Sequence, residues 1–188
     1  KGMPNDPDRA LVSMGNYLFS RQALVDVLLA DARRSTDHDF GRSIIPEMVP
    51  TGRVYAYDVQ SNEVPGVKPY EEHAYWRDVG TVDAYWAANM DLTHVVPELN
   101  LYDEAWPILS LQRQLPPAKF IPNQDGSHGI AVNTIVSGGC IVSGSHITSA
   151  VFFSNVRVHS HCTIDQAVVL PGVTIERNCR LRKVVLDR

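Results

Sequence analysis

The stretch Ile135-Val136-Ser137-Gly138-Gly139-Cys140-Ile141-Val142-Ser143-Gly144-Ser145-His146-Ile147 carries an isoleucine at every sixth position. The interval of six continues in two further sets, the second displaced by one residue after Pro171-Gly172: Val156, Cys162 and Val168, then Val173, Cys179 and Val185. One aliphatic side chain per short strand at a fixed spacing is typical of a hexapeptide β-helix, in which each strand forms one wall of a triangular coil. We therefore predict an all-β domain, a left-handed parallel β-helix, over residues 116–188.

An ordinary sheet of hairpins is the alternative structure for this segment. Such a sheet would need strands of about five to six residues and stronger turn dipeptides than the repeat offers. The fixed spacing therefore favours the β-helix.

The repeat also contains side chains that can bind metal ions. Its cysteines, Cys140, Cys162 and Cys179, form no C-x-x-C pair and leave one thiol over in any disulfide scheme, so we expect buried thiols. The pair His159-x-His161 could hold a metal ion, but it also fits two exposed residues at a corner of the coil. We favour the structural interpretation for both sets.

Upstream of the repeat, the stretch Tyr75-Trp76-Arg77-Asp78-Val79-Gly80-Thr81 joins two predicted elements. Its two leading aromatic residues suit the end of a buried strand, Gly80 allows a tight turn, and Thr81 can cap a helix over residues 82–92. Asp78 then lies between a strand and a helix, where open α/β sheets place their ligands. Its carboxylate either accepts backbone N–H groups of the turn or binds Mg²⁺ that carries substrate phosphates, and spacing alone leaves both open.

The first part of the chain mixes strand and helix patterns, as expected for an α/β domain. Small residues, Ser13 and Gly15, interrupt the first strand, as they do where a backbone approaches a ligand. The predicted elements are a strand over residues 11–19, a helix over 21–34 with Ser20 as its cap, a helix over 40–49 and a strand near 53–59. Between the two helices, His38 stands between Asp37 and Asp39. Acid–base chemistry or a metal is one interpretation of this trio, and hydrogen bonding within a polar turn is the one we favour.

Composition excludes several classes of function. The chain has 188 residues and a net charge of −4, so no broad basic surface supports nucleic-acid binding. No apolar run approaches the roughly 18 residues of a membrane span, and the first residues lack the apolar core of a signal peptide. We expect a cytoplasmic protein that acts on neither nucleic acid nor membrane.

The chain resembles the bacterial glucose-1-phosphate adenylyltransferases, or ADP-glucose pyrophosphorylases, over almost its whole length. Five motifs occur in the same order: Val12-Ser13-Met14-Gly15-Asn16-Tyr17, His38-Asp39-Phe40-Gly41, the stretch from Tyr75 to Thr81, Leu115-Pro116-Pro117-Ala118-Lys119-Phe120 and Val136-Ser137-Gly138-Gly139-Cys140. The resemblance implies the second half of a Rossmann-like nucleotidyltransferase domain with its linker over residues 1–115, followed by the β-helix over residues 116–188.

The resemblance also implies a reaction. These enzymes join ATP and α-D-glucose 1-phosphate into ADP-glucose and pyrophosphate with Mg²⁺ as cofactor, the regulated step of bacterial glycogen synthesis. Asp78 matches the family's aspartate for Mg²⁺ and glucose 1-phosphate and is the implied catalytic residue. Ser13 matches a serine that contacts the glucose, with Gly15 and Tyr17 shaping that wall, although ordinary strand packing would also explain the three.

Part of the catalytic machinery of this family is missing from the sequence. It contains no glycine-rich nucleotide loop, second metal aspartate or Glu-Lys-Pro motif, so we expect the chain alone to be inactive. A different sugar-1-phosphate nucleotidyltransferase and a non-catalytic regulatory subunit of the same fold are the rival interpretations.

Enzymes of this family are homotetramers regulated by sugar phosphates and AMP-type nucleotides at the junction of the two domains. Arg188 aligns with an arginine of the effector site and Gly138 with a regulatory segment, while Asn155 stands where some relatives carry arginine. Arg77 could steer a phosphate or form an internal ion pair. The remaining arginines of the repeat form either a basic strip or solvated corners: Arg157, Arg177, Arg180 and Arg182.

Overall fold

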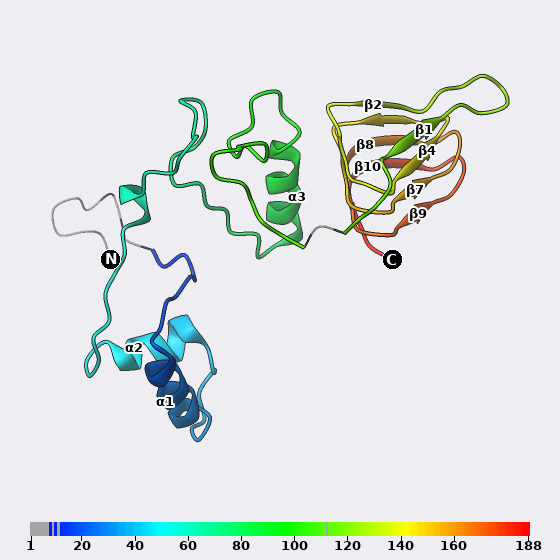
Figure 1. Cartoon of the computed structure of the whole chain (residues 1–188). Helices are drawn as coiled ribbons and strands as arrows, with labels where there is room; N and C mark the ends of the chain where they lie inside the picture. Colours follow the sequence, from blue (N-terminus) through cyan, green and yellow to red (C-terminus); the bar gives the residue numbers. More distant parts are fainter. Residues whose placement is uncertain (1–7, 9, 11, 112) are drawn as a thin grey trace. The chain divides into compact units, whose positions relative to one another are not determined.

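The computed structural model describes residues 8, 10, 12–111 and 113–188 (Figure 1). The first residue of the strand predicted over residues 11–19 lies outside the described residues. The chain divides into two compact units, residues 1–59 (unit 1) and residues 60–188 (unit 2). The domain boundary expected after residue 115 stays a prediction.

Unit 1 is helical in its described part. It contains helix α1 (Arg21–Asp31), the π-helical turn η1 (Phe40–Ile44) and the short helix α2 (Ile45–Met48). Ser20 caps α1 as predicted, accepting a hydrogen bond from the backbone N–H of Ala23 at 3.4 Å. The helix ends at Asp31 rather than at the predicted residue 34, because the next N–H groups bond three residues back, Arg33 to Ala30 and Arg34 to Asp31.

The strands predicted over residues 11–19, near 53–59 and at the start of the Tyr75–Thr81 stretch do not form. Residues 12–111 contain no strand, and Val59–Ser61 form a single turn of 3₁₀-helix, η2. A strand exists only where a neighbouring strand accepts and donates its backbone hydrogen bonds. The apolar patterns of these segments are therefore not sufficient to make them strands.

Helix α3 (Val82–Asp91) begins where the sequence predicted. The hydroxyl of Thr81 accepts a hydrogen bond from the N–H of Ala84 at 3.1 Å, which satisfies one of the free donors of the first turn. Leu92 ends the helix as its C-terminal cap.

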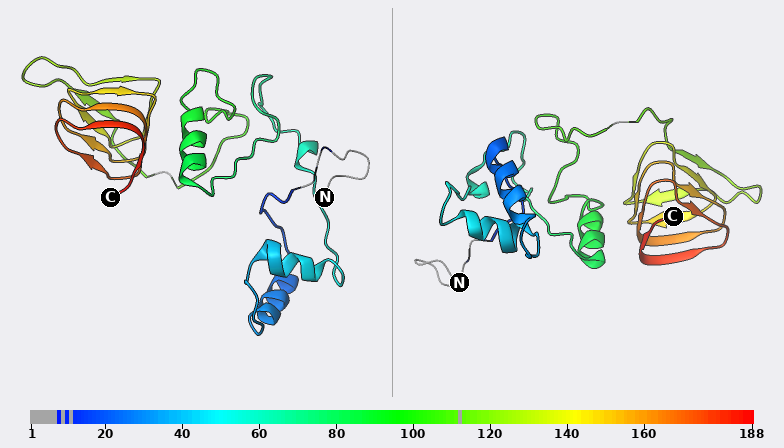
Figure 2. Two further views of the ribbon diagram at one scale, coloured as in Figure 1. Left: turned by 180° about the vertical axis from the view of Figure 1, so that it is seen from behind. Right: turned by 90° about the horizontal axis from the view of Figure 1, so that it is seen from below.

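The repeat forms the predicted parallel β-helix. One wall consists of β1 (Lys119–Ile121), β4 (Ile141–Ser143), β7 (Arg157–Val158) and β9 (Thr174–Ile175). The other two walls share one sheet made of β2 (Ile130–Val132), β5 (His146–Thr148), β3 (Ile135–Val136), β6 (Val151–Phe152), β8 (Thr163–Val169) and β10 (Arg180–Leu186). All strand pairs are parallel, and the successive coils stack as Figure 2 shows.

The coils are shorter than three full hexapeptides. Ile135 pairs with Val151 and Val151 with Val168, which are steps of 16 and 17 residues. At the same corner of successive coils, the chain turns at a single residue with positive φ: Asn133, Ser149, Gln166 and Lys183. This shortening explains the slip in the six-residue spacing.

The aliphatic series does not stay on one face of the coil. Ile147, Ile164 and Phe152 point into the interior and are fully buried, whereas Val168 and Val185 belong to an apolar cluster on the outside of one wall. The periodicity therefore identified the repeat, but it did not show which side chains point into the coil and which point outward.

Helix α3 packs on this outer cluster. Met90 is buried there against Val151 and Val168. Trp86 donates its indole N–H to the carbonyl of Gln166 at 2.8 Å, and the ammonium of Lys183 lies 5.0 Å from the Trp86 ring centre. Trp86 is therefore a packing residue.

Candidate functional site

The three residues implied for the sugar wall line one pocket in unit 1. The pocket has a volume of about 670 Å³ and is lined by Ser13, Gly15 and Tyr17. The other lining residues come from the segment before α1, from α1 itself and from the start of η1 with its cap: Phe19, Leu24, Asp39, Phe40 and Gly41. Segments far apart in the sequence of unit 1 thus form a single site.

Hydrogen bonds within the segment shape the floor of this pocket. The hydroxyls of Ser13 and Tyr17 lie 3.1 Å apart, and the N–H of Gly15 donates to the Ser13 hydroxyl at 3.3 Å. Gly15 has a φ of 74°, and a Cβ there would meet nothing within 4 Å. Its backbone conformation, not a lack of space, requires glycine. The segment is a hydrogen-bonded turn rather than the packed strand expected as the alternative.

An aromatic cluster forms one side of the pocket. The rings of Tyr17 and Phe40 stack with centroids 5.7 Å apart, and Phe19 lies 5.8 Å from Phe40. Asp39, beside Phe40, accepts a hydrogen bond from the N–H of Arg42 at 2.7 Å and so caps η1. From the sequence we considered Asp39 only as part of the turn around His38 and assigned no role to Phe40, although the motif that contains both was the available signal.

His38 lies next to this wall and makes structural contacts. Its Nδ1 lies 2.7 Å from a carboxylate oxygen of Asp31, and its backbone N–H donates to the hydroxyl of Thr36 at 3.2 Å. The partner is thus the last residue of α1 rather than the flanking Asp37 or Asp39. This geometry supports the favoured interpretation of a hydrogen-bonded turn.

Asp78 lies in unit 2, in an exposed turn before α3. One carboxylate oxygen accepts a hydrogen bond from the N–H of Gly80 at 3.0 Å, as the turn interpretation expected. The other oxygen has no hydrogen-bond partner within the described part of the chain. A single free carboxylate oxygen fits Mg²⁺ that is held mainly by substrate phosphates and water, since Mg²⁺ often takes only one or two carboxylates from a protein. Both interpretations of Asp78 are therefore compatible with its geometry.

Arg77 forms an internal ion-pair cluster. Its guanidinium contacts the carboxylates of Glu72 and Glu98 and lies 4.6 Å from the ring centre of Tyr75. The hydrogen bond to Glu72 raises the pKa of Arg77, and the same contact lowers the pKa of Glu72. Because Arg77 already has two carboxylate partners, we interpret it as a residue that fixes the turn rather than as a phosphate ligand.

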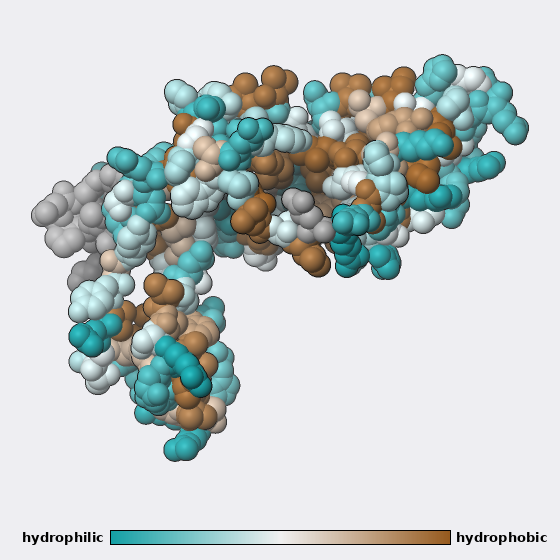
Figure 3. Space-filling model, viewed as in Figure 1, coloured by the Kyte–Doolittle hydropathy of each residue, from teal (hydrophilic) through white to brown (hydrophobic). Residues whose placement is uncertain are grey.

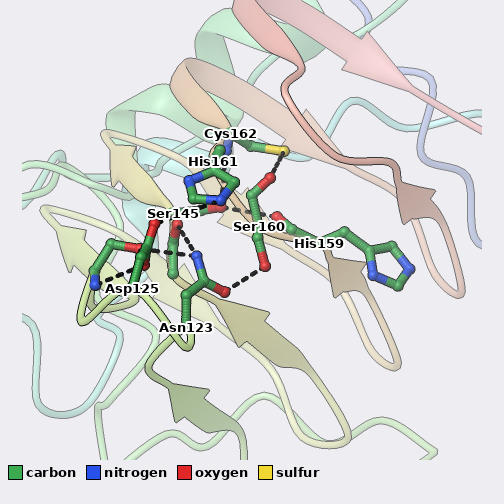
Figure 4. A network of polar contacts seen from close by, with 9 residues as sticks. Asn123, Asp125, Ser145, His159, Ser160, His161 and Cys162 are labelled. Atoms are coloured by element: carbon green, nitrogen blue, oxygen red, sulfur yellow. Dashed lines mark hydrogen bonds and ion pairs between the residues drawn. The ribbon is translucent and has the colours of Figure 1, made fainter.

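The histidine pair of the β-helix belongs to a polar network at a coil corner (Figure 4). His161 lies 3.7 Å from Asp125, and the carbonyl of His159 accepts a hydrogen bond from Ser145 at 2.8 Å. Asn123 accepts from the hydroxyl of Ser160 and donates to Ser127 at 2.8 Å. Within the described residues, no group of three or more His, Cys, Asp or Glu side chains is arranged to hold a metal ion.

The cysteines of the repeat are free thiols. Cys140 and Cys162 are buried in the β-helix, and Cys179 is half-buried. Burial raises the pKa of the Cys140 and Cys162 thiols. The expectation of buried thiols is confirmed for these two, whereas Cys179 is only partly buried.

Arg188, the implied effector residue, lies at the last described coil. Its Nε donates to the carbonyl of Pro171 at 3.0 Å, and its guanidinium covers Gly172, where a Cβ would approach it to 2.3 Å. The four arginines of the possible basic strip are exposed, and Arg182 pairs with Asp165 at 3.3 Å. Effector binding by Arg188 stays a prediction.

Comparison with protein families gives two matches. Residues 3–95 match the nucleotidyl transferase family, and residues 116–188 match the GlmU-like C-terminal hexapeptide family. A segment similar to nucleotidyl transferases is thus followed by a segment similar to hexapeptide repeats, which is the order the sequence predicted. None of the helices in the described part of the chain has the length and apolar character needed to cross a bilayer.

Proposed function

We propose that this chain, whose two family matches support a sugar nucleotidyltransferase, belongs to an enzyme that transfers the adenylyl group of ATP to α-D-glucose 1-phosphate. The products are ADP-glucose and pyrophosphate, and the reaction is the regulated step of bacterial glycogen synthesis. The observation that carries the proposal is the pocket of unit 1, because it gathers Ser13, Gly15 and Tyr17 on one concave surface.

The chemistry of this pocket suits a sugar. The hydroxyls of Ser13 and Tyr17 can each donate and accept a hydrogen bond, which matches the hydroxyl groups of glucose. The stacked rings of Tyr17 and Phe40 offer an apolar surface beside them. We propose that Ser13 contacts the glucose and that Gly15 and Tyr17 shape the wall.

Asp78 is the proposed ligand of Mg²⁺ and of the sugar phosphate. Bound Mg²⁺ would offset the charge that develops on the phosphates. In the proposed reaction a phosphate oxygen of the sugar forms a bond to the α-phosphorus of ATP while the bond to pyrophosphate breaks. The contribution of the chain is to bind and orient the sugar phosphate for this in-line displacement.

Regulation is proposed from the family resemblance. A homotetramer would bind sugar phosphates and AMP-type nucleotides, with Arg188 as one phosphate contact. The guanidinium of Arg188 is exposed and uses Nε for Pro171, which leaves its remaining N–H donors for an anion.

The test is a turnover assay of the intact enzyme with glucose 1-phosphate and each of ATP, UTP and dTTP, measured as pyrophosphate released. We expect ATP to be the best nucleotide by a clear margin in kcat/KM. A preference for UTP or dTTP would assign a different sugar-1-phosphate nucleotidyltransferase. Absence of turnover with every nucleotide, together with binding of sugar phosphates, would assign the non-catalytic subunit instead.

A further inference from the structure

The last residue of α1 is a buried carboxylate with a partner on each oxygen. Asp31 is only 4% exposed. One of its oxygens accepts a hydrogen bond from the Thr36 hydroxyl at 2.7 Å, and the other lies 2.7 Å from Nδ1 of His38. A buried carboxylate without partners would be strongly destabilising, so these contacts bind the turn of residues 35–39 to the end of α1.

His38 needs these contacts because its backbone is in the left-handed region. Its φ is 53°, a conformation that residues with a Cβ rarely adopt. Such a conformation persists only when the surroundings hold it in place. The contact with Asp31 and the hydrogen bond from the His38 N–H to Thr36 supply that restraint.

The direction of the chain at His38 decides where the next two side chains lie. Asp39 follows at once and caps η1 through the N–H of Arg42 at 2.7 Å. Phe40 comes next and stacks on Tyr17. Both Asp39 and Phe40 line the pocket that holds Ser13 and Tyr17, so the contact of the buried Asp31 carboxylate with the exposed His38 ring lies next to this wall along the chain.

We propose that Asp31 and His38 are positioning residues, whose contact holds the turn that presents Asp39 and Phe40 to the pocket. The inference rests on the proposed function, because it takes this pocket as the place where the sugar phosphate binds. Neither residue lines the pocket itself, so their effect on the substrate passes through the wall.

The charge state of Asp31 agrees with this role. Hydrogen bonds from His38 and Thr36 lower the pKa of the Asp31 carboxyl, with a smaller contribution from the charge of Arg34. The carboxylate is therefore ionised at neutral pH and accepts from both partners. Two arginines near the turn form ion pairs with other carboxylates, Arg34 with Glu47 and Arg42 with Asp37.

Three substitutions of His38 separate the hydrogen bond from the backbone conformation. His38→Asn keeps an amide donor near the place of Nδ1 and tolerates positive φ. His38→Gly tolerates the conformation but lacks the donor, and His38→Ala lacks both. His94→Ala is the matched control, since His94 forms a similar pair with Asp91 at the end of α3, in unit 2 and away from the pocket residues.

The first measurement is the KM of the intact enzyme for the sugar phosphate and for the nucleotide. We expect His38→Ala and His38→Gly to raise the KM for the sugar phosphate about tenfold, with little change in the KM for the nucleotide. His38→Asn should stay within about twofold of the wild type. An equal rise in both KM values, or an unchanged KM for the sugar phosphate in His38→Gly, would overturn the inference.

The second measurement is hydrogen exchange of the backbone amides of residues 39–44, which needs no turnover. We expect faster exchange there in the alanine and glycine variants and normal exchange in His38→Asn and His94→Ala. Unchanged exchange in His38→Gly would show that the turn does not depend on this contact. If the wild-type enzyme turns over no sugar phosphate, the proposed function fails, and the exchange series alone decides the positioning role.

Discussion

The geometry of Asp78 allows one side chain to hold a turn and to serve the proposed Mg²⁺ site. Its carboxylate has two oxygens, and the N–H of Gly80 occupies only one of them. Glycine suits residue 80, because a Cβ there would lie only 3.1 Å from that same oxygen of Asp78. Arg77, beside Asp78, holds the preceding segment through Glu72 and Glu98. The free oxygen is therefore presented from a turn fixed on both sides.

The variant Asp78→Asn tests the proposed ligand role. We expect kcat of the intact enzyme to fall on the order of 100-fold, because the amide retains the acceptor for Gly80 but loses the charge that binds Mg²⁺. The free energy of unfolding should change by less than about 0.5 kcal/mol. Asp83→Asn, an exposed carboxylate in the first turn of α3, is the control and should have normal kcat. Near-normal turnover of Asp78→Asn at saturating Mg²⁺ would refute the assignment.

Asp31 gives the stability of unit 1 a dependence on pH. Its pKa lies below the ordinary value of 3.8, so the folded carboxyl is the stronger acid. The stabilisation is therefore complete above the unfolded pKa and is lost as pH falls through the folded pKa. We expect the urea midpoint to fall on acidification below about pH 4, and to fall less in Asp31→Asn. Parallel curves for the two proteins between about pH 7 and about pH 3 would contradict this.

Helix α3 is the element that connects the Asp78 turn with the β-helix. Thr81, which directly follows the Asp78 turn, caps the N-terminus of this helix. Met90 and Trp86, further along the helix, pack on the outer wall of the coils. Figures 1 and 2 show α3 beside the β-helix from each direction. Because a helix is stiff, the packing of α3 on the β-helix helps to fix the position of the Asp78 turn relative to the coils.

The contribution of Trp86 to this packing can be measured. Trp86→Ala removes the apolar contact and the hydrogen bond to Gln166, and we expect unfolding free energy to fall by about 2–3 kcal/mol. Trp86→Phe keeps a ring and should cost about 1 kcal/mol. Trp106→Ala is the control, since Trp106 is 57% exposed, and should stay within about 0.5 kcal/mol. Calorimetric unfolding measures all three, and equal losses in Trp86→Ala and Trp106→Ala would exclude this packing role.

At the scale of the whole molecule, apolar surface is left uncovered in both units. Figure 3 shows brown apolar areas spread over the visible face. Leu18 in unit 1 is fully exposed, and Leu109 and Leu111 in unit 2 are each 86% exposed. Contiguous apolar surface on a soluble protein usually marks a contact with another chain or segment.

We therefore expect the isolated chain to self-associate in solution. Light scattering after gel filtration should give a mass above the 20.9 kDa of one chain, increasing with concentration. The double change Leu109→Ser with Leu111→Ser should reduce the association, whereas Gln124→Ser, in an exposed loop, should leave it unchanged. A monomer at every concentration would count against both the expected association and the proposed homotetramer.

The sequence alone determined the features that depend on local chemistry. Thr81 and Ser20 were predicted as caps because a hydroxyl at that place satisfies a free N–H in any helix. The β-helix followed from spacing because each coil repeats the same short unit on the one before it.

Only the tertiary structure decided which segments pair and which side chains meet. The expected strands before α3 are absent because strand formation depends on a partner that no local pattern specifies. Asp31 and His38 come together because α1 ends one turn earlier than its apolar pattern suggested, which directs the Asp31 carboxylate at the following turn. Asp39 and Phe40 line the same pocket as Ser13. The sequence did not predict this, because the position of a side chain in space depends on every turn of the chain before it.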